Sequence, residues 1–133
     1  MIDFGSLLGR VAVGVCFVVH GLGKLGFVGS GTMAGFTEFL RERGVPVPQV
    51  QARIAMLSEI VGGTLLAMGL LMRPACLLLV GTMLVAGVVG HRGAGYLITN
   101  EPPGAEYTIN LVVVLLVLLL MGPGRFSFDA VLF

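Results

Sequence analysis

The chain has 133 residues, of which 56% are hydrophobic and only 11% are charged, whereas a soluble domain carries about 25% charged residues. A small globular domain buries only about two-thirds of its surface, so it cannot hide this many apolar side chains from water. The net charge of +1 offers no basic surface for nucleic acid. These numbers exclude an ordinary soluble enzyme, a nucleic-acid-binding protein and a disordered tail, and they make lipid the solvent of most of the chain.

Four apolar segments are long enough, or nearly long enough, to cross a bilayer. A hydrocarbon core about 30 Å thick needs roughly 20 apolar residues per helix, within a range of about 17–25. The segments cover residues 7–27, 54–72, 74–91 and 106–122. The first is expected to stay in the mature protein, because Asp3 precedes it and no A-x-A cleavage site follows.

An amphipathic pattern lies between the first two spans. Apolar residues at helical spacing have charged residues on the opposite side, namely Met33, Phe36, Phe39 and Leu40 against Glu38, Arg41, Glu42 and Arg43. Gly44 and Pro46 then end the pattern. We expect a short helix lying on the membrane surface, with a solvated loop as the alternative.

The remaining connections predict how the spans are arranged. Arg73-Pro74 is the whole connector between the second and third predicted spans, so these two form a tight antiparallel hairpin. Residues 91–105 join the third and fourth spans through two prolines and a glycine. The Phe-rich tail after Gly124 is expected to rest at the membrane interface. The predicted fold is an all-α integral membrane bundle of four antiparallel helices, a single domain over residues 1–133.

Polar side chains within the spans gather near one membrane face. An ionisable residue inside a span is costly and is by default a functional candidate. Counting 1.5 Å per residue along helices of alternating direction places one group of them at the same end: His20, Lys24, Glu59, His91, Glu106, Tyr107 and Asn110. A carboxylate in a low dielectric needs a neighbouring cation to stay ionised, so we expect Lys24 to pair with Glu59.

This convergence predicts a polar ligand-binding pocket lined by His20, Lys24, Glu59, Tyr107 and Asn110. Further polar residues are accessory candidates, namely Arg10, His91, Glu106 and Arg125. The alternative is structural, because interhelical polar contacts hold bundles together for about 0.6 kcal/mol each. No metal site is expected, since the two histidines lack acidic and cysteine neighbours. Cys16 and Cys76 differ in depth by roughly 10 Å, too far for a disulfide.

Several motifs, in their order and spacing, resemble those of the DoxX family over nearly the whole chain. They are Arg10, Gly14, His20-Gly and Lys24, then Glu59, Gly62-Gly63 and the leucine-rich run to Arg73-Pro-Ala, and the ending Gly122-Pro-Gly-Arg-Phe-Ser-Phe-Asp129. The resemblance implies a multi-pass protein of a bacterial inner membrane with both termini on the cytoplasmic side. The distribution of Lys and Arg between the two faces favours the opposite orientation. The family's recurring polar positions match Arg10, Lys24, Glu59 and Arg125.

The resemblance also implies a function class. The family is named for a small subunit of a thiosulfate:quinone oxidoreductase, and other members are linked to oxidative-stress or thiol-related assemblies. The leading hypothesis is therefore a membrane subunit of an oxidoreductase assembly that offers quinone a polar pocket, with the redox centre in a protein partner. A non-catalytic membrane scaffold or assembly factor is the alternative, and a small carrier is a third. The sequence leaves open whether the chain is catalytic and whether it forms a homo-oligomer.

Overall fold

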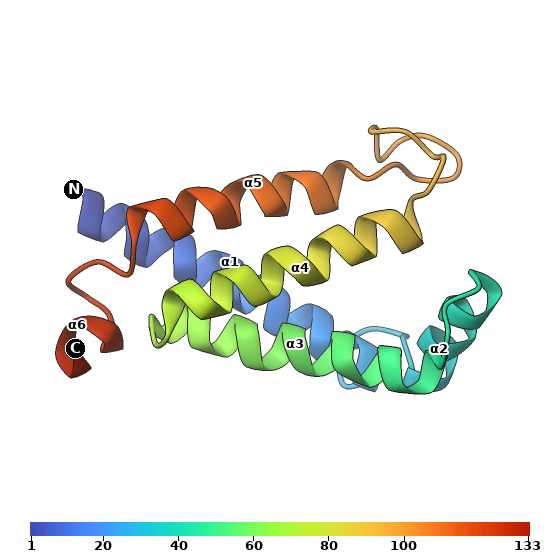
Figure 1. Cartoon of the computed structure of the whole chain (residues 1–133), viewed down its shortest axis with the longest axis horizontal. Coiled ribbons are helices and arrows are strands. Elements are labelled where there is room, and N and C mark those ends of the chain that lie inside the picture. The colour runs from blue at the N-terminus through green and yellow to red at the C-terminus, as the bar shows by residue number, and fades with distance from the viewer.

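The computed structural model describes residues 1–133 and is entirely helical. Its elements are α1 (Ile2–Leu25), α2 (Met33–Glu42), α3 (Pro48–Met68), α4 (Met72–Gly90), α5 (Glu106–Met121) and α6 (Phe128–Leu132). The four longest helices run lengthwise with alternating direction, while α2 covers one end of the bundle and α6 lies at the other, near the N-terminus (Figure 1). The predicted all-α antiparallel bundle is confirmed.

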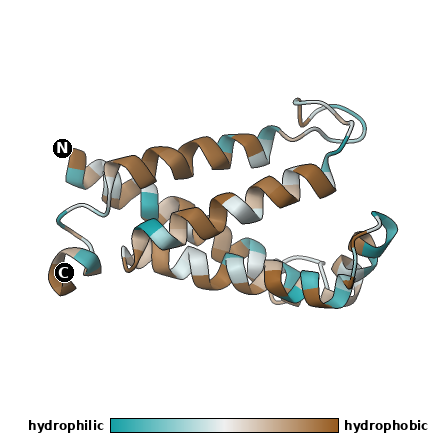
Figure 2. Ribbon diagram, viewed as in Figure 1, coloured by the Kyte–Doolittle hydropathy of each residue, from teal (hydrophilic) through white to brown (hydrophobic).

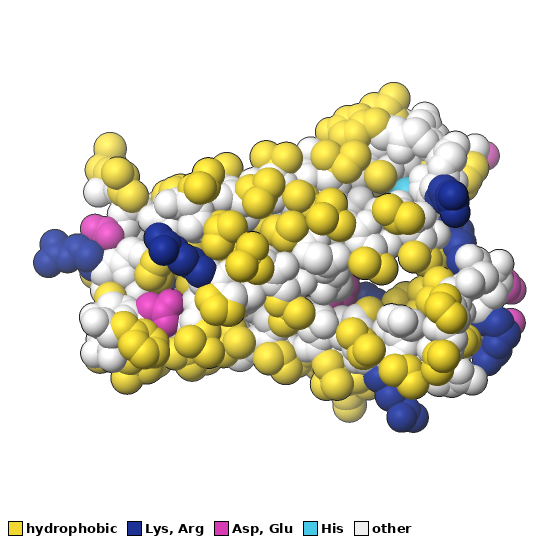
Figure 3. Space-filling model, viewed as in Figure 1, with side chains coloured by type: hydrophobic (Ala, Val, Ile, Leu, Met, Phe, Trp, Pro, Cys, Tyr) yellow, Lys and Arg dark blue, Asp and Glu magenta, His cyan; other side chains and the backbone are white.

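The surface of the bundle is that of a membrane protein. Three helices, α1, α3 and α4, are long and apolar enough to cross a bilayer. Helix α5 has 16 residues and therefore spans about 24 Å. Only 23 of 133 residues are buried, and the middle of the bundle is hydrophobic while charged side chains lie toward its two ends (Figures 2 and 3). Lipid is thus the natural cover for the exposed apolar side chains.

The second span is shifted toward the N-terminus relative to the prediction of 54–72. Helix α3 begins at Pro48, because proline fits the first turn of a helix, where its missing N–H has no partner to lose. It ends at Met68, because Gly69 adopts the left-handed conformation with φ of 67°. Part of the segment predicted to be a surface connection is therefore the start of the membrane helix.

The predicted Arg73-Pro74 connector is wrong. The turn between α3 and α4 consists of residues 69–71, and Arg73 and Pro74 lie in the first turn of α4. Helix α1 also begins earlier than predicted, at Ile2. The predicted third and fourth spans agree with α4 and α5 to within two residues at each end.

The amphipathic segment between the first two spans forms α2, so the solvated-loop alternative is excluded. Thr32 caps its N-terminus, because the Thr32 hydroxyl accepts a hydrogen bond from the Gly35 N–H at 3.0 Å. Leu40 is buried and Phe36 is partly buried on the inner face, while Glu38 and Arg41 pair on the exposed face. Helix α2 therefore packs as an amphipathic helix on the end of the bundle.

Glycines bring α1 and α3 into direct backbone contact. A Cβ atom added to Gly14 would lie 2.5 Å from the Gly63 carbonyl oxygen, and one added to Gly63 would lie 2.7 Å from the Gly14 carbonyl oxygen. Small residues allow membrane helices to approach this closely. The close packing sets the register that places Lys24, at the end of α1, beside Glu59 of α3.

The C-terminal tail fastens the end of the bundle opposite α2. The Arg10 guanidinium, 2% exposed, donates to the carbonyl oxygens of Ala67 in α3 and Phe126 in the tail. The Asp129 carboxylate accepts from the backbone N–H groups of residues 71–72, at 2.7 and 2.9 Å. We call this set of contacts, between Arg10, the α3–α4 turn and residues 122–129, the tail clasp.

Additional hydrogen bonds connect the tail clasp to α1. The Ser6 hydroxyl donates to the Gly122 carbonyl at 2.8 Å, and the Asp3 carboxylate accepts from the backbone N–H of Arg125 at 3.0 Å. Ser127 caps α6 by accepting from the Ala130 N–H at 3.1 Å. The motif at the end of the chain therefore closes the bundle.

Candidate functional site

A pocket of about 610 Å³ lies between α3 and α4 at the end that α2 covers, and the hollow is visible on the surface in Figure 3. Its walls are mostly apolar and include Phe36, Phe39, Leu40, Ile54, Leu78 and Val89. Among the other lining residues, Leu77 and Val85 are 59% and 61% exposed. The pocket therefore opens on the apolar side of the bundle, where lipid meets it.

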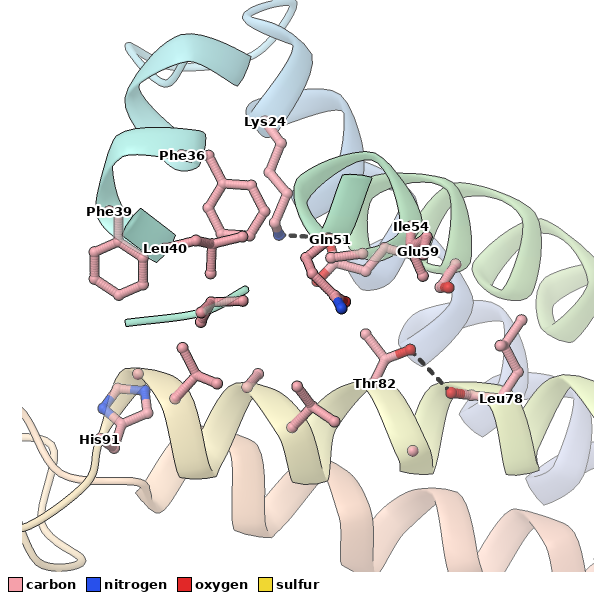
Figure 4. A pocket seen from close by; sticks show the side chains of 18 of the residues that line it. Lys24, Phe36, Phe39, Leu40, Gln51, Ile54, Glu59, Leu78, Thr82 and His91 are labelled. Carbon is pink, nitrogen blue, oxygen red and sulfur yellow. Dashed lines mark hydrogen bonds and ion pairs between the residues drawn. The ribbon is translucent and has the colours of Figure 1, made fainter. Parts of the chain in front are cut away.

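The predicted Lys24–Glu59 ion pair is present at the polar end of this pocket. The Lys24 ammonium lies 2.5 Å from the Glu59 carboxylate, and the two side chains are 19% and 6% exposed. The ammonium also lies 5.0 Å from the centre of the Phe36 ring, within the range of a cation–π contact. Figure 4 shows Lys24 reaching from the end of α1 toward α3, beside Phe36 of α2. Three helices thus hold one charge pair in an apolar surrounding.

His91 and Thr82 supply polar groups from the α4 side of the pocket (Figure 4). The Nδ1 atom of His91 lies 2.8 Å from the Pro103 carbonyl oxygen. Because a carbonyl only accepts, Nδ1 carries the proton, and Nε2 of the neutral ring is an acceptor. The Thr82 hydroxyl donates to the Leu78 carbonyl at 2.9 Å, which leaves its oxygen able to accept. The pocket therefore carries hydrogen-bonding groups on opposite walls.

Arg43 fastens α2 over the end of the pocket. Its guanidinium donates to the carbonyl oxygens of Val89 and Gly90, at 3.0 and 2.6 Å. These are among the last carbonyls of α4, which have no partner within the helix and carry its negative dipole end. The guanidinium carbon lies 4.4 Å from the centre of the Phe39 ring. Helix α2 is thus connected to α4 across the pocket.

His20 and Tyr107 do not line this pocket and meet instead between α1 and α5. The Tyr107 hydroxyl lies 3.1 Å from Nε2 of His20, and the two rings stack with centres 5.3 Å apart. The Cys16 sulfur lies 3.2 Å from the same hydroxyl. Sequence reasoning considered Cys16 only as a disulfide candidate, although its spacing of four residues from His20 indicates a shared helix face.

The remaining predicted site residues form contacts in a loop and at one end of the bundle. Asn110 accepts a hydrogen bond from the Tyr96 hydroxyl at 3.1 Å, and Glu106 accepts one from the Ile98 N–H at 3.0 Å; both fasten the loop between α4 and α5. Arg10 lies in the tail clasp, far along α1 from the pocket. Only the backbone of Arg125 takes part in the tail clasp, and its side chain is exposed. The structure therefore divides the predicted set between one pocket and several separate contacts.

Comparison with known proteins assigns the chain to a family. The sequence model of the DoxX family matches residues 5–92, well over half of the chain. The chain belongs to the DoxX family. The matched range contains every residue that lines the pocket.

The chain is also similar to the inner membrane protein YphA of Escherichia coli (strain K12), with 27% identity over 139 residues, covering 96% of this chain and 94% of YphA. No solved structure matches the chain. With its membrane-length helices, this member of the DoxX family is a multi-pass inner-membrane protein.

Proposed function

We propose that this DoxX family protein is the membrane subunit of an oxidoreductase assembly and that it binds a quinone head group in the pocket between α3 and α4. The observation that carries the proposal is an apolar pocket of about 610 Å³, open toward lipid, with the Lys24–Glu59 pair at one end. Binding pockets for small molecules typically measure about 300–1,000 Å³ and combine apolar walls with a few polar groups. A quinone matches this pattern, because it dissolves in lipid and carries two carbonyl acceptors on an apolar body.

Each polar group has a distinct role in this proposal. Lys24 donates a hydrogen bond to one quinone carbonyl, and Glu59 holds the ammonium charged and in place. His91 and Thr82 accept hydrogen bonds from the hydroxyl groups of the reduced quinol on the α4 side. Reduction of a quinone to a quinol consumes two electrons and two protons. In the proposal the electrons come from the redox centre of a partner protein, and the Lys24–Glu59 pair relays protons.

A pocket-filling variant tests quinone binding without disturbing the fold. Gly81 lines the pocket, and a Cβ atom added there meets no atom within 4 Å. Gly81→Leu therefore adds a Cβ atom without a clash, and we expect the rest of the leucine side chain to narrow the pocket. The matched control is Gly5→Leu, at the other end of the bundle, where an added Cβ atom meets only the end of a Met121 side chain at 4.0 Å.

The measurement is the quinone content of protein purified in mild detergent, determined by mass spectrometry after solvent extraction. Wild type and Gly5→Leu should retain quinone at about one molecule per chain, and Gly81→Leu should lose it. Equal quinone content in Gly81→Leu and Gly5→Leu would contradict the proposed site.

A scaffold function is the second candidate, and the exposed aromatic side chains of the tail favour it. Phe126, Phe128 and Phe133 are 61%, 49% and 89% exposed, although the tail backbone is firmly fastened. Such a surface suits docking of another membrane subunit. The two functions separate in the variant Lys24→Met with Glu59→Leu. A scaffold would still assemble an active complex when it carries these substitutions, whereas a quinone-binding subunit would not.

A further inference from the structure

Three chemically active side chains that do not line the pocket between α3 and α4 meet between α1 and α5. The Cys16 sulfur lies 3.2 Å from the Tyr107 hydroxyl oxygen, and that oxygen lies 3.1 Å from Nε2 of His20. None of the three lines the pocket between α3 and α4. They form a separate cluster, contributed by two helices, and neither the proposed function nor the family assignment gives it a role.

The hydrogen-bond directions in this cluster follow from its contacts. Nδ1 of His20 lies 2.7 Å from the backbone carbonyl oxygen of Cys16, and a carbonyl can only accept. The Tyr107 hydroxyl lies 3.1 Å from Nε2 and 3.3 Å from Nδ1, and the Cys16 sulfur lies 3.7 Å from Nδ1. Because Nδ1 donates its proton to the carbonyl, Nε2 is the ring nitrogen left to accept from the hydroxyl. The Tyr107 oxygen then accepts from the Cys16 thiol. The result is an oriented chain from the thiol, through the phenol, to the imidazole.

The surroundings define which reagents reach Cys16. Cys16 is only partly covered, and its neighbours Val15 and Val19 are 51% and 41% exposed on the apolar surface of α1. A reagent therefore arrives through the lipid and must be uncharged. His20 is exposed, so the base at the far end of the chain can return its proton to the surroundings. Cys76, the other cysteine, is fully buried and has no hydrogen-bonding partner.

We propose that Cys16 is a modification site for membrane-soluble electrophiles of the α,β-unsaturated carbonyl class, with Tyr107 and His20 as its proton relay. The sulfur forms a bond to the β-carbon of the electrophile while the carbon–carbon π bond breaks. The thiol proton passes to the Tyr107 oxygen as the Tyr107 proton passes to Nε2 of His20. The resulting enolate takes up a proton at its α-carbon, and His20 releases one, so the net reaction adds S–H across the double bond.

The test is the rate of alkylation by N-ethylmaleimide in proteoliposomes. Samples are quenched at timed intervals, and the Cys16 and Cys76 peptides are measured by mass spectrometry. In the wild type, Cys16 should react much faster than Cys76. Tyr107→Phe and His20→Gln should each slow Cys16 by about tenfold or more, the lower range of general-base contributions. The double variant should be no slower than either single variant, because both residues act in one chain.

An internal reference and a second variant make the test decisive. Cys76 reports loosening of the bundle, and its rate should stay unchanged in all variants. His20 is exposed, so His20→Gln removes little packing beyond the stack on Tyr107 and tests the relay even if Tyr107→Phe folds poorly. Cys16 reacting no faster than Cys76, or reacting at the wild-type rate in His20→Gln, would overturn the proposal.

Discussion

The two ends of the bundle both bury a basic side chain, but they satisfy it in different ways. In the tail clasp, Arg10 donates to two backbone carbonyls, and Asp129 accepts from two backbone N–H groups. At the other end, Lys24 and Glu59 satisfy one another and border a pocket. Arg10 also borders a pocket, of about 390 Å³, but its hydrogen bonds go to main-chain carbonyls and fix the fold, whereas the Lys24–Glu59 pair borders the larger pocket and is not bound to main chain. Burial alone therefore does not identify a functional charge in a membrane bundle.

The largest effect on stability should come from the tail clasp. Arg10→Met removes two charge-assisted hydrogen bonds and leaves the carbonyls of Ala67 and Phe126 without this partner. The free energy of unfolding should fall by about 3 kcal/mol, since each such bond is worth roughly 1.5–3 kcal/mol. The measurement is an unfolding titration in mixed micelles. Folded Arg10→Met should still bind quinone with wild-type affinity. If Arg10→Met instead lost affinity for quinone while keeping its stability, Arg10 would serve ligand binding rather than the fold, which would contradict the difference drawn between the two ends.

Substitutions in the Lys24–Glu59 pair should affect quinone binding more than stability, in contrast to Arg10→Met. Lys24→Met alone leaves a nearly buried carboxylate without its cation and should cost about 2 kcal/mol of unfolding free energy. Lys24→Met combined with Glu59→Leu should recover most of that stability, because apolar side chains replace a buried ion pair at little cost. Quinone binding should fall by at least about tenfold in both variants, the equivalent of one charge-assisted hydrogen bond. Restored binding in the double variant would show that the pair is structural, like the tail clasp.

A smaller effect is expected at Arg43, which fastens α2 to the end of α4. Arg43→Gln removes the contacts to the carbonyls of Val89 and Gly90 and should cost about 1 kcal/mol. Backbone amides of α2 should then exchange hydrogen about fivefold faster, while those of α5 stay unchanged, as measured by exchange mass spectrometry. Arg41→Gln is the matched control, because Arg41 pairs only with Glu38 on the exposed face of α2. Equal effects of the two variants would contradict a role for Arg43 in holding α2 over the pocket.

The smallest effect, and the only stabilising one, is expected at Leu71 in the tail clasp. Leu71 has φ of 47°, a left-handed conformation that costs a residue with a Cβ atom about 1 kcal/mol and suits glycine. Leu71→Gly should therefore raise the free energy of unfolding by about 0.5 kcal/mol, since its N–H to Asp129 remains. A clear loss of stability in the same unfolding titration would show that the Leu71 side chain contributes more by packing than its backbone loses by strain.

The hydrophobic runs, together with the position of each charged residue along its helix, were sufficient to predict the bundle, its helix order and the Lys24–Glu59 pair. They could not place the α3–α4 turn, because its position depends on Gly69 and on the contact between Leu71 and Asp129, 58 residues away. Local propensity carries no signal of that tertiary contact. Leu70, Leu71 and Met72 are all apolar, so the sequence alone places the connector at the first charged residue and proline that follow, Arg73-Pro74.

Depth along a helix also leaves the rotation of each helix undetermined. His20 and Lys24 lie four residues apart and near the same membrane face, yet His20 contacts α5 and Lys24 contacts α3. The predicted pocket therefore combined residues that the structure distributes over different helix pairs. The pocket itself required the position of α2, which packs on α3 and reaches the last carbonyls of α4 through Arg43.

Photolabelling with a quinone analogue locates any quinone bound at the end of the bundle that α2 covers. The protein is placed in lipid nanodiscs with an azidoquinone, illuminated, digested, and mapped by mass spectrometry, with and without excess unlabelled quinone. We expect labels on peptides from α2, α3 and α4 around the pocket. Excess unlabelled quinone should reduce these labels, and Gly81→Leu should lose them while Gly5→Leu keeps them. Labels confined to α5 or to the tail clasp, or labels that unlabelled quinone does not reduce, would contradict it.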